Sequence, residues 1–128
     1  MDSRKMRLLL VEDSPIQAKI ANRLLTEIGF DVEHTTTGEE AVVMSRDNQY
    51  DLGIFDIGLD GMLSGDQAVE EIRQLGEENG GYPIFAVTAH VSEEAIQHYK
   101  SIGINEVFEK PIKKQRIIEA FEKIRVCK

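Results

Sequence analysis

Four short apolar runs of this 128-residue chain each end at side chains that could do chemistry. Those side chains are Glu12 with Asp13, Asp56, Thr88 and Lys110. Three carboxylates brought together would repel one another, because each like pair costs roughly 4 kcal/mol at ~4 Å and an effective dielectric of about 20. A proton or a cation must relieve that repulsion, and oxygen ligands of this kind suit Mg²⁺, with Mn²⁺ as the alternative. Together with a hydroxyl and a lysine, this set favours phosphoryl transfer to a carboxylate nucleophile.

The elements that would position these residues alternate regularly along the chain. Apolar runs predict strands at 7–11, 30–35, 52–55, 84–87 and 107–108, and the stretches between and after them have helical spacing. Five strands alternating with five helices predict an α/β fold, in which a parallel sheet is covered by helices on both faces. The carboxyl ends of parallel strands lie along one edge, where ligands bind. Any one of the four polar positions alone could be an ordinary residue at a strand end; together they predict one cleft.

The first predicted helix shows clear signals at both ends. Ser14 is typical of an N-cap, Pro15 of the first helical position and Gly29 of the residue that ends a helix. One apolar face is expected from Ile16, Ile20, Leu24 and Ile28, joined by Ala21 and Leu25.

Composition limits the class of protein. The 15 basic and 23 acidic residues give a net charge of −8, which argues against a nucleic-acid-binding surface. The only cysteine, Cys127, rules out a disulfide framework within the chain. The apolar runs are too short to span a membrane, and no signal peptide is visible at the N-terminus. We therefore expect one cytoplasmic domain over 1–128, with its core at about 7–124.

Segments 10–14, 50–57, 87–89 and 110–111 together resemble the receiver domain of two-component response regulators, in order and in separation. The resemblance runs from about Arg7 to Ile124. It implies the flavodoxin-like, CheY-like fold: a five-stranded parallel sheet of order 2-1-3-4-5 flanked by five helices in three layers. The segment 103–112 resembles receivers of hybrid sensor histidine kinases more than those fused to DNA-binding domains.

By this resemblance, each site residue acquires a function in a phosphorylation switch. Asp56 would accept the phosphoryl group, and Mg²⁺ would be bound by Asp13 and Asp56, by the Gly58 carbonyl oxygen and by Glu12 through water. Thr88 and the Ala89 backbone N–H would bind phosphoryl oxygens. Lys110 would pair with the phosphoryl group, or with Asp56 before modification. The resemblance also implies a cis peptide bond before Pro111.

The resemblance also implies partners: a histidine kinase or histidine phosphotransfer protein, and a downstream effector or a second copy of the chain. Exposed residues near Pro15 and Gln17 are candidates for docking the phosphodonor. The chain would be a signalling switch rather than an enzyme, either as a stand-alone receiver or as a fragment of a larger protein.

Several positions depart from the family pattern. Asp60 stands where a proline is common, and the loop 60–65 is one residue longer than usual. Val107 replaces the aromatic residue often found three positions before the lysine, while Gly58 and His90 occupy variable positions beside the site. His90 is the only histidine expected near the site, bordering either solvent or the phosphate.

Three other functions were weighed. A receiver-like interaction module that works without phosphorylation would bind no Mg²⁺. An aspartate-nucleophile phosphatase would need a second carboxylate where Gly58 stands. A flavin carrier would need a Ser/Thr/Gly-rich loop after the first strand. His34 and His98 have no nearby ligand set, and Met62 with Leu63 is expected to pack within its loop rather than to contact a partner.

Overall fold

The computed structural model describes residues 5–58 and 64–126, and within them it contains one parallel five-stranded sheet. The strand order is β2-β1-β3-β4-β5, as predicted. The strands are β1 (Arg7–Val11), β2 (Asp31–Thr35), β3 (Leu52–Asp56), β4 (Ile84–Thr88) and β5 (Glu106–Glu109). All five residues of β3 are buried, which suits the central strand of a sheet covered on both faces.

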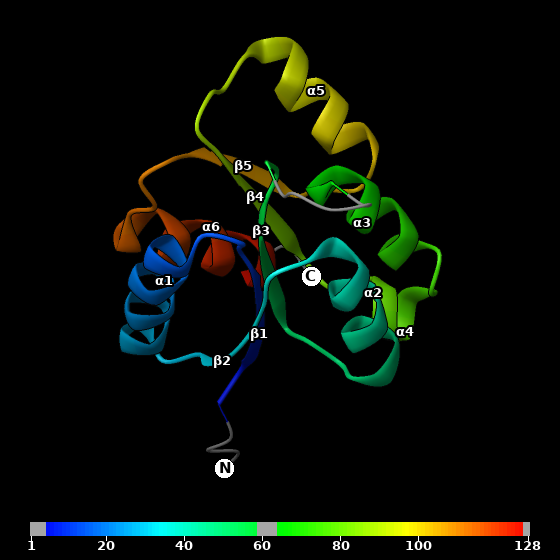
Figure 1. Ribbon diagram of the computed structural model, residues 1–128, viewed down its shortest axis with the longest axis horizontal. Coiled ribbons are helices and arrows are strands. Elements are labelled where there is room, and N and C mark those ends of the chain that lie inside the picture. Colours follow the sequence, from blue (N-terminus) through cyan, green and yellow to red (C-terminus); the bar gives the residue numbers. More distant parts are fainter. Residues whose placement is uncertain (1–4, 59–63, 127–128) are drawn as a thin grey trace.

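Helices cover both faces of this sheet, giving the expected three layers (Figure 1). One face carries α1 (Pro15–Ile28) and α6 (Lys114–Val126). The other carries α2 (Gly38–Asp47), α3 (Gly65–Arg73) and α5 (Glu93–Ser101). None of the helices formed by the described residues is long and apolar enough to cross a membrane.

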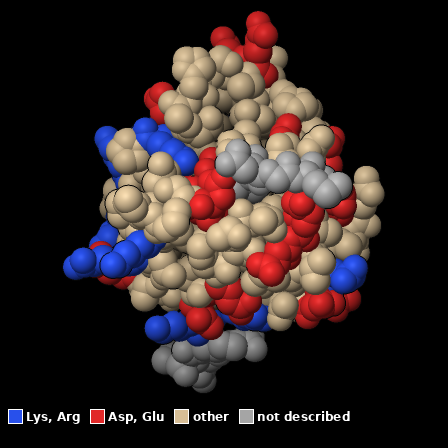
Figure 2. Space-filling model, viewed as in Figure 1, with Lys and Arg blue, Asp and Glu red and all other residues tan. Residues whose placement is uncertain are grey.

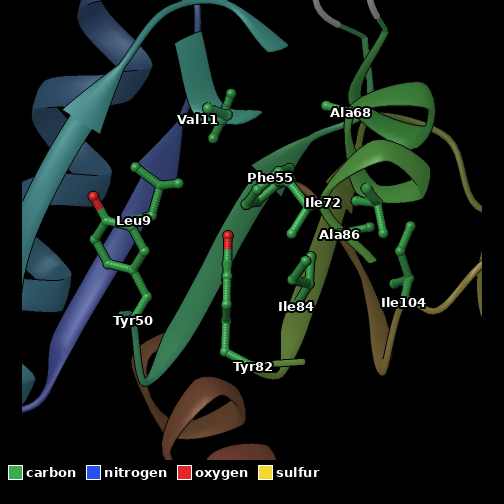
Figure 3. Packing of buried hydrophobic residues seen from close by; sticks show 12 residues of the cluster. Leu9, Val11, Tyr50, Phe55, Ala68, Ile72, Tyr82, Ile84, Ala86 and Ile104 are labelled. Atoms are coloured by element: carbon green, nitrogen blue, oxygen red, sulfur yellow. The ribbon is translucent and has the colours of Figure 1, made fainter. Parts of the chain in front are cut away.

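Two apolar cores result, one on each face of the sheet. Leu9 and Phe55 point to the face covered by α2 and α3, and Figure 3 shows them with Ile84 and Ile72 in the same layer. Leu8 and its neighbours pack on the opposite face against α1 and α6. Successive side chains of a strand point to opposite faces, so the same buried strands supply apolar side chains to both cores. The polar side chains lie at the carboxyl ends of the strands.

The apolar face predicted for the first helix is partly wrong. Its caps are confirmed, but Ile16 and Ile20 are 74% and 62% exposed, and the helix packs through Ala18, Ala21 and Leu25. Residues four apart advance roughly 40° beyond a full turn, so an i, i+4 stripe winds around the helix. The first two members of the stripe therefore face outward, and only its later members reach the core.

The predicted number of five helices is also wrong, because residues 5–58 and 64–126 already form six, the additional one being the single turn α4 (Glu77–Gly80). The Gly80-Gly81 pair predicts only a break in the chain. Instead Gly76, with φ +99°, starts a turn that Gly80 ends in close contact with α3. A Cβ on Gly80 would lie 2.0 Å from the Ile72 carbonyl oxygen, so only glycine fits there.

Candidate functional site

The structure brings the three acidic residues together at the carboxyl edge of the sheet. Glu12 and Asp13 follow β1, and Asp56 ends β3, its hydrogen-bonded neighbour in the sheet. One carboxylate oxygen from each of the three lies within 4.8 Å of the others. Among the described residues, this is the one group of three or more acidic, histidine or cysteine side chains close enough to hold a metal ion.

Glu12 is the most constrained member of this cluster. It is only 6% exposed, and its Oε2 accepts a hydrogen bond from the Ser14 backbone N–H at 3.1 Å. Burial, followed by a hydrogen bond with Asp56, raises the pKa of the Glu12 carboxyl above its usual range. The cluster therefore favours either a shared proton or an added cation.

Lys110 reaches the same cluster from the end of β5. Its Nζ lies 3.2 Å from Asp56 Oδ2 and 3.4 Å from Glu12 Oε1. The Lys110 side chain is 21% exposed, so its charge is only partly screened by water. The peptide bond from Lys110 to Pro111 is cis, which confirms the prediction from the resemblance.

Thr88 ends β4, next to β3 in the sheet. Its hydroxyl donates to the His90 carbonyl oxygen at 3.2 Å and accepts from the His90 N–H at 3.3 Å. Ala89 and the His90 residue itself are exposed. The hydroxyl is thus occupied by its own turn, and none of the interactions recorded for Thr88 reaches the acidic cluster.

Gly58 lies beside the cluster and contacts it through its backbone. Its N–H donates to Asp56 Oδ1 at 3.0 Å, which fixes the orientation of that carboxylate. The predictions for Asp60, Met62 and Leu63 fall outside the described residues.

The sequence analysis missed three contributors to this site. Gln17 Oε1 accepts a hydrogen bond from Lys110 Nζ at 2.7 Å, and His34 Nε2 donates to the Glu12 carbonyl oxygen at 2.8 Å. A Cβ on Gly65 would lie 2.4 Å from the Asp56 carbonyl oxygen, so α3 can start against the site only with glycine. No signal in the sequence marks any of these three residues as a neighbour of the acidic cluster.

The donor chemistry of the cluster fits a hard divalent cation. Three carboxylates with one nearby ammonium leave negative charge that Mg²⁺ would offset. On the face shown in Figure 2, acidic side chains form a broad band, and most basic ones lie toward the side of α1 and α6. The fold and the cluster together define a doubly wound α/β protein with an acidic, lysine-containing site at its ligand-binding edge.

Comparison with known proteins makes the class specific. The family model of the response regulator receiver domain matches residues 8–122. The chain therefore belongs to the response regulator receiver domain family. It is a receiver domain of the two-component signalling type.

Two curated relatives illustrate the similarity. The autoinducer 2 sensor kinase/phosphatase LuxQ of Vibrio parahaemolyticus is 35% identical over 116 residues, covering 91% of this chain but only 13% of LuxQ. Two-component response regulator 24 of Arabidopsis thaliana is 29% identical, covering 94% of this chain and 84% of that protein. The chain thus matches a small part of the kinase and most of the regulator.

A solved structure supports the same class. The receiver domain of sensor histidine kinase PA1611 from Pseudomonas aeruginosa has a TM-score of 0.82 and 29% identity, covering 94% of this chain and 97% of that one. In that protein a magnesium ion is coordinated in the active site cleft.

Proposed function

We propose that this receiver domain is a phosphorylation switch in which Asp56 accepts a phosphoryl group. The donor would be a phosphohistidine of a histidine kinase or a histidine phosphotransfer protein. One observation carries the proposal: Asp56 shares a cluster 4.8 Å across with two further carboxylates, and Lys110 Nζ lies 3.2 Å from its Oδ2. This combines a nucleophile, a cation site and a fixed positive charge in one place.

The transfer balances as follows. An Asp56 carboxylate oxygen attacks phosphorus, an O–P bond forms and the P–N bond to the donor imidazole breaks. The electron pair of that bond stays on the imidazole nitrogen, and because the other ring nitrogen of the donor carries a proton, the donor leaves as a neutral histidine side chain. The product is an acyl phosphate on Asp56, with about one more negative charge than the carboxylate carried.

Asp13, Asp56 and the Gly58 carbonyl oxygen would hold Mg²⁺, or Mn²⁺ in its place, with Glu12 assisting through water. When bound, the ion supplies positive charge for the phosphoryl oxygens. The Gly58 N–H keeps Asp56 Oδ1 in place, at 3.0 Å, and so leaves Oδ2 on the side of Lys110. After transfer, the Lys110 ammonium would pair with an oxygen of the new phosphoryl group instead of with the Asp56 carboxylate.

Thr88 gives the switch its second state. Its hydroxyl now donates to the His90 carbonyl oxygen at 3.2 Å, a long hydrogen bond between exposed groups. A phosphoryl oxygen would be a stronger, charged acceptor for this hydroxyl and for the Ala89 N–H. Exchange of the acceptor, from the His90 carbonyl oxygen to a phosphoryl oxygen, would move the turn between β4 and α5, so phosphorylation would shift the population between two conformations.

The proposal includes the setting expected from sequence. The chain 1–128 would act as a single receiver domain in the cytoplasm, signalling to an effector or a second copy rather than turning over a substrate. A receiver joined to a kinase and a stand-alone receiver would share this chemistry.

Phosphotransfer from a purified, ³²P-labelled phosphohistidine protein tests the proposal. We expect Mg²⁺-dependent transfer to the wild-type chain and none to Asp56→Ala. Asp47→Ala, which removes an exposed carboxylate at the end of α2, is the matched control and should accept label like the wild type. Equal labelling of Asp56→Ala and wild type would overturn the proposal, as would absence of transfer from every donor tried.

A further inference from the structure

Lys110 has an acceptor outside the acidic cluster, and it is the nearest of the three. Nζ lies 2.7 Å from Gln17 Oε1, against 3.2 Å to Asp56 Oδ2 and 3.4 Å to Glu12 Oε1. An ammonium has three N–H donors, so these three acceptors use all of them. A neutral amide thus holds the ammonium more closely than two carboxylates do.

This arrangement is informative because charge alone would favour the opposite order. Hydrogen bonds from an ammonium to carboxylates are normally shorter and stronger than those to a neutral amide. Here the amide lies on α1 and the lysine on the connection between β5 and α6, so the pair joins two separate segments. Gln17 therefore draws the ammonium toward α1 and away from full contact with the carboxylates.

The surroundings leave room for this displacement. Gln17 and Lys110 both line a cavity of about 320 Å³ between α1 and the segment that follows β5. Most of its other walls are apolar, including Ile20, Leu24 and Ile112. The two other polar residues of the lining are Glu12 and Asp56 themselves, so Gln17 is the acceptor that holds the ammonium on the side of α1.

We propose that Gln17 is a positioning residue that holds Lys110 at the outer side of the Glu12–Asp56 carboxylate pair and so keeps those oxygens open to a divalent cation. The inference rests on the proposed function, and it differs from the docking role that the family resemblance suggests for this part of α1. Without Gln17, the third N–H of Lys110 turns to the carboxylates. A cation then has to displace it, because two positive charges compete for the same oxygens.

The experiment is a Mg²⁺ titration of the whole chain. Binding is monitored through the NMR signal of the Gly58 amide, which donates a hydrogen bond to Asp56. Gln17→Met keeps the length of the side chain and removes the acceptor; we expect Mg²⁺ to bind about three- to tenfold more weakly. Gln17→Glu keeps an acceptor for Lys110 and should bind Mg²⁺ at least as tightly as the wild type. Gln97→Met, an exposed glutamine on α5, is the matched control and should leave the affinity unchanged.

A double-mutant cycle separates positioning from any general effect of the substitution. In a Lys110→Met background, Gln17→Met should change the Mg²⁺ affinity less than twofold, since there is no ammonium left to hold. An equal loss in both backgrounds would overturn the inference, as would an unchanged affinity for Gln17→Met alone. Absence of saturable Mg²⁺ binding by the wild type would instead contradict the proposed function itself.

Discussion

Two cations at opposite ends of the sheet show how differently the fold uses positive charge. Arg73, near the amino ends of the strands, donates five hydrogen bonds: to the carbonyl oxygens of Gly80 and Tyr82, twice to that of Gly103, and to the Asn105 side chain. Every N–H of its guanidinium therefore has an acceptor, and the four oxygens that accept these five hydrogen bonds are all neutral. Burial lowers the pKa of Arg73.

Lys110, at the carboxyl edge, is held instead by two carboxylates and an amide. Its two carboxylate acceptors repel each other, and either can be exchanged for a phosphoryl oxygen without leaving a backbone carbonyl unsatisfied. Arg73 ties α3, α4 and the turn before β5 into one fixed arrangement. A planar donor among backbone carbonyls therefore stabilises the fold, whereas a point charge among carboxylates suits a site whose contacts can be exchanged.

The largest expected effect is on the structural side of this comparison. Arg73→Met leaves partly buried carbonyl oxygens without their donors, so we expect the free energy of unfolding to fall by about 3–4 kcal/mol. Urea denaturation measures it, with Arg46→Met, an exposed arginine on α2, as the control expected to change stability by under about 0.5 kcal/mol. A loss below about 1 kcal/mol would show that Arg73 is not the tie that its contacts indicate.

The corresponding change at the site should act on chemistry more than on stability. Lys110→Met should slow phosphorylation of Asp56 by a small-molecule phosphodonor about 30- to 100-fold, equivalent to about 2–3 kcal/mol in the barrier. The same variant should bind Mg²⁺ more tightly, because a competing positive charge is gone. Lys113→Met, an exposed lysine three residues away, is the control. Equal phosphorylation rates for Lys110→Met and wild type would contradict the claim that Lys110 acts on the chemistry of the site while Arg73 acts on stability.

A third prediction concerns the glycine that lets α3 approach the site. Gly65→Ala places a methyl group 2.4 Å from the Asp56 carbonyl oxygen, so α3 has to shift. We expect a loss of about 2 kcal/mol in stability by urea denaturation. Gly58→Ala, whose Cβ would lie 3.7 Å from Asp56 Oδ1, is the control for stability alone. Equal stability of the two alanine variants would contradict the packing described.

The smallest effect concerns charge repulsion within the cluster. The folded-state pKa of Glu12 is raised above its usual 4.5, so ionising Glu12 is harder in the folded chain than in the unfolded one. Without Mg²⁺, this residue therefore costs stability as pH rises above that value, and the cost is absent below it. Glu12→Gln should be about 1 kcal/mol more stable than wild type at pH 7 with chelator. This gain is smaller than the repulsion between two isolated like charges, because Lys110 offsets part of that repulsion.

Denaturation at several pH values, with and without Mg²⁺, measures this difference. We expect the gain from Glu12→Gln to vanish in acid and to shrink when Mg²⁺ is added. A Glu12→Gln variant that is less stable than wild type at pH 7 in chelator would show that the carboxylates do not repel.

Much of the fold could be predicted because each strand and several helix ends carry a local signal. Ser14, Pro15 and Gly29 mark α1 correctly, and the apolar runs mark all five strands. The orientation of Ile16 and Ile20 could not be predicted in the same way, since it depends on which side of α1 meets the sheet. The turn α4 is likewise set by close packing of Gly80 on α3 rather than by periodicity.

The part of the candidate site that lies at strand ends could be predicted, because the strand topology alone brings those ends together. Glu12, Asp13, Asp56 and Lys110 meet because parallel strands end at one edge. Gln17 and His34 lie at the site through side-chain reach from α1 and β2, which no spacing rule describes. The fit of Gly65 against Asp56 is likewise a matter of backbone contact.

The central claim is that Asp56 is the phosphoacceptor, and one measurement tests it most directly. The wild-type chain is incubated with a small-molecule phosphodonor, digested and mapped by mass spectrometry, once with Mg²⁺ and once with chelator. We predict a phosphoryl group on Asp56 with Mg²⁺ and none with chelator. A phosphoryl group on another residue, equal modification of Asp56 under both conditions, or an unmodified chain in Mg²⁺ would contradict it.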